Sequence, residues 1–103
     1  MTTSIEPTVL SDAVPVWERS SVRIPILKRL IADCDRLAAD LDQEVRNEED
    51  RVRIHDPAHC AYPTYAKATA SRRDNLRRSA DGLRAHLAKA EQALRELGEA
   101  LDA

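Results

Sequence analysis

Aromatic side chains are almost missing from this chain of 103 residues, which has no Phe, one Trp and two Tyr. Glycine is also scarce, with two residues. A compact core of this length normally uses several large aromatic side chains to fill its volume. Charged residues make up 33% of the chain, and Ala and Leu supply most of the apolar ones. This composition is typical of long helices that pack along a narrow seam.

Three further absences limit the class of protein. No window alternates apolar and polar β-branched residues, so strands are not expected. No stretch approaches the roughly 20 apolar residues that span a bilayer, and the first residues lack the basic start and apolar run of a signal peptide. We therefore expect a cytoplasmic protein, at most peripheral to a membrane, with Cys34 and Cys60 as free thiols. The net charge of −2 argues against nucleic acid as a partner.

The first helix is predicted to span about residues 25–54. Pro25 disfavours helical geometry at Ile24, and it suits the first position of a helix. Residues 1–24 are predicted to be flexible and largely disordered, with Trp17 as the one candidate for docking. Apolar residues recur every three or four positions, with one slip before Val45, as a helical stripe requires. This stripe consists of Leu27, Leu30, Cys34, Leu37, Leu41, Val45 and Val52.

The second helix is predicted to span about residues 64–101, after a tip at residues 55–63. Within the tip, Asp56 and Pro57 predict one short helical turn, and Pro63 closes it by holding Tyr62 extended. The second helix carries an unbroken repeat of four-residue and three-residue steps, which indicates a coiled coil. This repeat consists of Leu76, Ala80, Leu83, Leu87, Ala90, Leu94, Leu97 and Leu101.

Charge predicts that the two helices run antiparallel. The end of the first helix is acidic and the start of the second is basic, so they face each other only in a hairpin. The facing residues should have numbers that sum to about 118. The predicted fold is therefore all-α, an antiparallel two-helix coiled-coil hairpin over residues 25–103. In this register Leu94, Leu97 and Leu101 extend beyond the first helix, and either the segment before Pro25 or another chain would cover them.

The tip and the second helix read DPAHCAYPTYAKATASRRDNLRRSADGLRAHL over residues 56–87. This run resembles the FliJ-type flagellar export proteins, in particular those of alphaproteobacteria. The shared features are Asp-Pro, His, Ala-Tyr-Pro, Tyr-Ala-Lys-Ala and an Arg-Arg-Asp-Asn-Leu segment. The resemblance covers about residues 30–97. It implies an antiparallel coiled coil of the bacterial type III export apparatus that binds the export ATPase and the export gate.

The sequence supports a binding protein and not an enzyme. His55, His59 and Cys60 lack the four ligands at recognised spacing that zinc requires, and no nucleophile has an orienting partner, so no metal, cofactor or catalytic residue is predicted. The alternative to the export adaptor is a small helical regulatory or structural protein that forms a homodimer through an exposed leucine stripe. The candidate partner-binding residues are Tyr62, Tyr65, Arg72, Arg73, Arg77, Arg78, Leu94, Leu97, Leu101 and Trp17.

Overall fold

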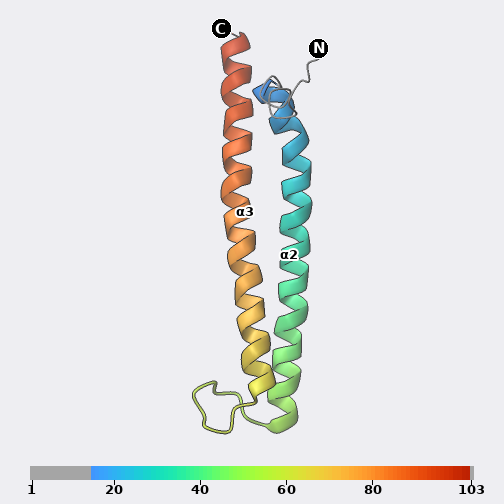
Figure 1. Ribbon diagram of the computed structural model, residues 1–103, viewed down its shortest axis with the longest axis vertical. Helices are drawn as coiled ribbons and strands as arrows, with labels where there is room; N and C mark the ends of the chain where they lie inside the picture. The colour runs from blue at the N-terminus through green and yellow to red at the C-terminus, as the bar shows by residue number, and fades with distance from the viewer. Residues whose placement is uncertain (1–14, 103) are drawn as a thin grey trace, which may run out of the picture.

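Two long antiparallel helices lie side by side in the computed structural model, which describes residues 15–102 (Figure 1). Helix α2 spans Val16–Val52 and helix α3 spans Thr64–Asp102. At 1.5 Å per residue, they are about 56 and 58 Å long. The part of the chain that the structure describes contains no strand, so the predicted all-α hairpin is confirmed.

Helix α2 begins well before Pro25, so the predicted start of the first helix is wrong. The backbone carbonyl of Pro15 accepts hydrogen bonds from the N–H groups of Glu18 and Arg19, both at 3.1 Å. Pro25 lies inside the helix, although a proline removes one helical hydrogen bond. Packing against α3 offsets this loss, because Leu27 is buried two residues later. Residues 16–24 are therefore helical, and residues 1–14 of the predicted flexible segment lie outside the described residues.

Backbone conformation and hydrogen bonds near the tip define where α2 ends and α3 begins. Arg53 takes the left-handed conformation, with φ of 60°, and Ile54 donates its N–H to the carbonyl of Glu49 at 3.2 Å. This is the usual way to end an α-helix, although glycine is the residue that most often takes the left-handed position. Helix α3 starts at Thr64, as predicted, and the carbonyl of Pro63 accepts the N–H of Lys67 at 3.1 Å.

The core is a single line of contact between the helices. Its most buried apolar residues are Leu27, Ile31, Ala38 and Val45 on α2, and Ala66 and Ala80 on α3. We call the α2 line the hairpin seam, and its members recur at steps of four and three without a slip. They are Ser20, Ile24, Leu27, Ile31, Cys34, Ala38, Leu41, Val45, Glu48 and Val52.

Two leucines of the predicted α2 stripe lie outside this seam. Leu30 and Leu37 are 44% and 45% exposed, while their neighbours Ile31 and Ala38 are buried. The strict heptad spacing explains the difference, because Ile31 and Ala38 continue the repeat and remove the slip that the predicted stripe showed. Small residues such as Ala38 and Ala80 also let the two backbones approach closely.

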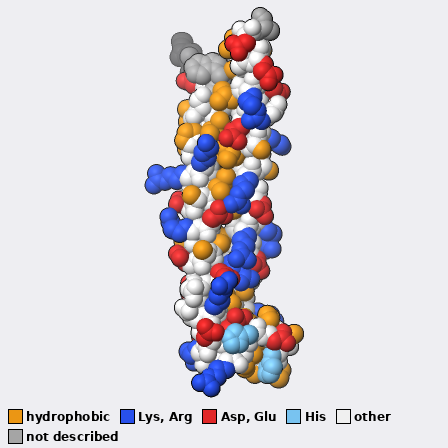
Figure 2. Space-filling view, turned by 180° about the vertical axis from the view of Figure 1, so that it is seen from behind, with side chains coloured by type: hydrophobic (Ala, Val, Ile, Leu, Met, Phe, Trp, Pro, Cys, Tyr) orange, Lys and Arg blue, Asp and Glu red, His pale blue; other side chains and the backbone are white. Residues whose placement is uncertain are grey.

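Charged pairs join the helices along the seam, and Figure 2 shows acidic and basic side chains close together on one face of the hairpin. The guanidinium of Arg73 lies 2.7 Å from the carboxylate of Asp42, and Arg84 pairs with Asp35. The residue numbers of these two pairs sum to 115 and 119. These values lie on either side of the predicted sum of about 118. Such flanking pairs set helix orientation more than they add stability.

Candidate partner-binding site

The tip loop folds around the side chains of Asp56 and His59. The Asp56 carboxylate accepts the N–H of Ala58 at 2.9 Å, and Nδ1 of His59 accepts the N–H of Ala61 at 3.0 Å. The backbone carbonyls of these two residues accept the N–H groups of His59 and Tyr62, both at 3.0 Å. The predicted helical turn is therefore replaced by two successive turns, because local side chains satisfy the N–H groups that a helix would use.

Tyr62 and Tyr65 fasten the base of the tip to the acidic end of α2. The Tyr62 hydroxyl donates to Glu49 Oε2 at 2.8 Å, and the Tyr65 hydroxyl donates to Glu44 Oε1 at 2.5 Å. Burial, with the Glu49 carboxylate, raises the pKa of Tyr62, and the hydrogen bond to Glu44 raises the pKa of Tyr65. The Tyr62 ring is half-buried, whereas Tyr65 is 52% exposed. Tyr65 is therefore the ring that a partner can reach.

Arg73 has a structural position between the two helices. Its side chain is 19% exposed, and it donates to Asp42 at 2.7 Å and to Asp74 at 3.0 Å. Asp42 also forms an ion pair with Arg46 at 3.0 Å, and one of its carboxylate oxygens lies 3.8 Å from the Arg77 guanidinium. The hydrogen bond from Arg73 is the main reason that the pKa of Asp42 is lowered. Asp42 is thus the centre of the charged network that holds the start of α3 against α2.

The other three arginines of the predicted site are exposed, and only Arg77 contacts this network. Arg72 and Arg78 are exposed, and Arg78 donates to Asn75 within the same helix. Arg77 is also exposed but remains within reach of Asp42 and Asp74. The structure therefore brings Tyr65, Arg72 and Arg78 to the accessible surface near the tip and separates them from Arg73.

The segment before Pro25 covers part of the leucine stripe at the open end, which is one of the two predicted arrangements. Because α2 begins at Val16, Ile24 lies beside Leu94 along a shallow surface groove. Leu94 and Leu97 are half-buried, while Leu101 is 78% exposed. Trp17 lies in the first turn of α2, and its side chain is outside the described part of the structure. The expected stripe of three exposed leucines is thus reduced to Leu101.

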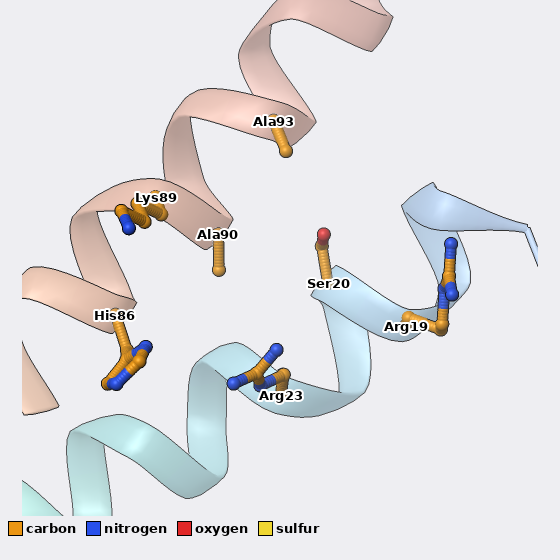
Figure 3. Close-up of a pocket in the computed structure, with 7 residues that line it drawn as sticks. All are labelled: Arg19, Ser20, Arg23, His86, Lys89, Ala90 and Ala93. Carbon is orange, nitrogen blue, oxygen red and sulfur yellow. The ribbon is translucent and has the colours of Figure 1, made fainter.

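A basic groove at the open end was missed by the sequence analysis. Arg19 and Arg23 on α2 and His86 and Lys89 on α3 surround a groove of about 260 Å³ (Figure 3). Among the described residues, Ser20, Ala90 and Ala93 complete its lining, and no lining residue is acidic. Figure 3 shows the side chains of Ser20, Ala90 and Ala93 pointing into the space between the two helices. Arg19 and Arg23 are four positions apart, which places them on one face of a helix. The predicted first helix began at Pro25, so this shared face was not recognised.

Neither a metal site nor a membrane span is found among the described residues. His55 pairs with Asp50 at 2.9 Å, and residues 15–102 contain no group of three His, Cys, Asp or Glu side chains that could hold a metal ion. Neither described helix is long and apolar enough to cross a bilayer. No protein-family model matches the chain, and no curated protein or solved structure matches it significantly.

Proposed function

We propose that this protein is a non-enzymatic coiled-coil adaptor of the bacterial flagellar type III export apparatus. Its partners would be the export ATPase, the export gate or both. The proposal is supported by the resemblance of residues 56–87 to the FliJ-type flagellar export proteins. These residues form the tip and more than half of α3. In that segment Tyr65, Arg72 and Arg78 are exposed, which is the combination of aromatic and arginine side chains that protein interfaces favour.

The hairpin suits an adaptor because it presents this surface rigidly. Two helices of nearly 40 residues hold the tip at one end, and the network around Asp42 fixes the start of α3. A pre-ordered surface loses little conformational entropy when a partner binds. Arg73 would act by positioning the start of α3, whereas Tyr65, Arg72 and Arg78 would contact the partner.

A pull-down with the full-length chain tests the proposal, with the export ATPase and the cytoplasmic domain of the export gate as separate partners. We expect binding to at least one of them. Replacement of Tyr65, Arg72 and Arg78 by Ala together should weaken that binding by at least tenfold, because the loss of a single hot-spot tyrosine or arginine costs about 2 kcal/mol.

The matched control replaces Lys28 and Arg29 by Ala, since both are exposed on α2 away from the tip. This variant should bind like the wild type. Absence of binding to both partners, or equal binding by the tip variant and the control, would contradict the proposal. Far-UV circular dichroism should show the same helical content in all three proteins.

A further inference from the structure

Helix α2 carries a second heptad repeat directly beside the hairpin seam. We call it the outer stripe, and each of its residues precedes a seam residue by one position. Its members are Arg19, Arg23, Ile26, Leu30, Asp33, Leu37, Asp40 and Glu44. The apolar members Ile26, Leu30 and Leu37 are 53%, 44% and 45% exposed. A helix with two adjacent heptad repeats has surfaces for two neighbouring helices, and α3 covers only one of them.

The order of side chains along the outer stripe is self-complementary. It is basic at the start of α2, apolar in the middle except for Asp33, and acidic at the end. In an antiparallel pair of stripes, Arg19 faces Glu44, Arg23 faces Asp40, and Ile26 faces Leu37. Leu30 faces Asp33, whose carboxylate is paired with Arg36 of its own helix at 3.3 Å. A parallel pair would instead place arginine against arginine and carboxylate against carboxylate, which is unfavourable. We infer that the outer stripe binds the outer stripe of a second copy of this chain, in an antiparallel dimer with two-fold symmetry.

The basic groove is the site on each copy that would bind the acidic end of the partner's outer stripe. Arg19, Arg23 and Asp40 form no ion pair within the described part of the chain, so their charges remain available. The groove around Arg19 and Arg23 also includes His86 and Lys89, and none of its described lining residues is acidic. In the dimer, Asp40 and Glu44 of the second copy would approach this groove. Each pair occurs twice, because the interface is symmetric.

The adjacent face of α3 fits the same arrangement. His86, Ala90 and Ala93 line the groove beside the outer stripe, and Leu76, Ser79 and Leu83 continue their line at heptad spacing. The two-fold axis that pairs Ile26 with Leu37 of the second copy also places this line of α3 against the same line of α3 in the second copy. Leu76 then faces Ala93, and Ser79 faces Ala90. These are small or apolar contacts, so the two hairpins form a four-helix bundle without opposing like charges on this line.

The available area is large enough for a stable dimer. The outer stripe spans 25 residues between Arg19 and Glu44, which is about 38 Å of helix. Two helices packed side by side give a face about 20 Å wide. Each copy therefore offers about 750 Å², and the dimer would bury about 1,500 Å² in total, within the usual range for specific interfaces.

Charge substitutions in the full-length chain test the inference, with molar mass measured by sedimentation over a range of protein concentrations. The wild type should form a concentration-dependent dimer. Arg23→Glu and Asp40→Arg should each weaken self-association by roughly tenfold or more, because each places like charges together at two symmetric positions. The double variant carrying both changes should recover most of the wild-type affinity. Lys28→Glu, on the other flank of the hairpin seam, should have no effect.

A wild type that stays monomeric at every concentration would overturn the inference and leave the outer stripe to a different protein. Single variants that dimerise as well as the wild type would also overturn it, as would a double variant without recovery. Circular dichroism of each variant separates weakened association from loss of folding. Tyr65 of the tip site contacts the end of this surface through its hydrogen bond to Glu44. Arg23 and Asp40 are not part of the tip site, so their charge variants test self-association separately from the pull-down described above.

Discussion

Replacing Asp42 by Asn should destabilise the hairpin and change how its stability depends on pH. The Asp42 side chain is 19% exposed, accepts a hydrogen bond from Arg73 at 2.7 Å and forms an ion pair with Arg46 at 3.0 Å. Asn keeps the size of the side chain but removes the charge that strengthens the hydrogen bond from Arg73 and holds the ion pair. Charge-assisted hydrogen bonds are about twice as strong as neutral ones, so we expect a loss of about 1–2 kcal/mol at pH 7. For a domain of this size that corresponds to about 5–10 °C in Tm.

The pH dependence follows from the lowered pKa of Asp42, which the hydrogen bond from Arg73 mainly causes. A carboxyl group whose pKa is lowered on folding contributes its full stability above its unfolded pKa, which is about 3.9. That contribution is lost as the pH falls through the folded pKa. The difference between wild type and Asp42→Asn should therefore be largest near neutral pH and shrink below about pH 4.

Urea unfolding followed by circular dichroism at several pH values measures this difference. The matched control is Asp81→Asn, since Asp81 is 76% exposed and pairs with Arg84 at 3.1 Å on the surface of α3. Surface pairs contribute at most about 1 kcal/mol, so the control should change stability little. Equal losses for Asp42→Asn and Asp81→Asn at pH 7 would refute the central role of Asp42, and so would a difference that persists unchanged at acidic pH.

Urea unfolding also tests three further changes. Val45→Ala removes two methyl groups from a residue that is 4% exposed and should cost about 2 kcal/mol; a loss under about 0.5 kcal/mol would place Val45 outside the core. Thr69→Val should stabilise the fold by about 1 kcal/mol, because the buried Thr69 hydroxyl makes no hydrogen bond of ordinary geometry among the described residues, although it lies near the Tyr65 hydroxyl. A loss of stability would show that the contact with Tyr65 is a stabilising hydrogen bond. Arg53→Gly should add about 0.5–1 kcal/mol by relieving the left-handed backbone at φ of 60°, and a decrease would argue against that helix end.

The sequence predicted α3 closely because local signals and long-range packing agree there. Pro63 marks the start of the helix, and the unbroken heptad repeat from Leu76 onward needs no choice between neighbouring residues. In α2 these signals disagree. Pro25 locally favours a helix start, but the line of contact with α3 continues through Ile24 to Ser20 and keeps the earlier residues helical.

The stripe on α2 was assigned partly wrongly because the sequence offers two adjacent repeats. Leu30 and Leu37 are larger and more apolar than Ala38, and the prediction chose them by residue type. Strict spacing would have chosen Ile31 and Ala38, which are the residues that the hairpin buries. The basic groove was missed for a different reason: it forms only when α2 extends back to Arg19, before the predicted helix start at Pro25.

The candidate site at the tip was predicted as a set of residues but not as an arrangement. Which tyrosine is buried depends on loop turns that Asp56 and His59 stabilise through their own side chains. Which arginine is structural depends on a register accurate to one turn, and Arg73 meets Asp42 only in the observed one. Composition and periodicity do not fix the helix register that closely.

Cysteine cross-linking tests most directly the claim that α2 has two binding surfaces, one for α3 and one for a second copy. In a chain with Cys34→Ser and Cys60→Ser, the changes Ile26→Cys and Leu37→Cys together place facing thiols in the antiparallel dimer. Mild oxidation should then give a covalent dimer, whereas Ile26→Cys alone should give little. No covalent dimer from the double variant, or equally efficient cross-linking through Ile26→Cys alone, would contradict the antiparallel pairing of the outer stripes.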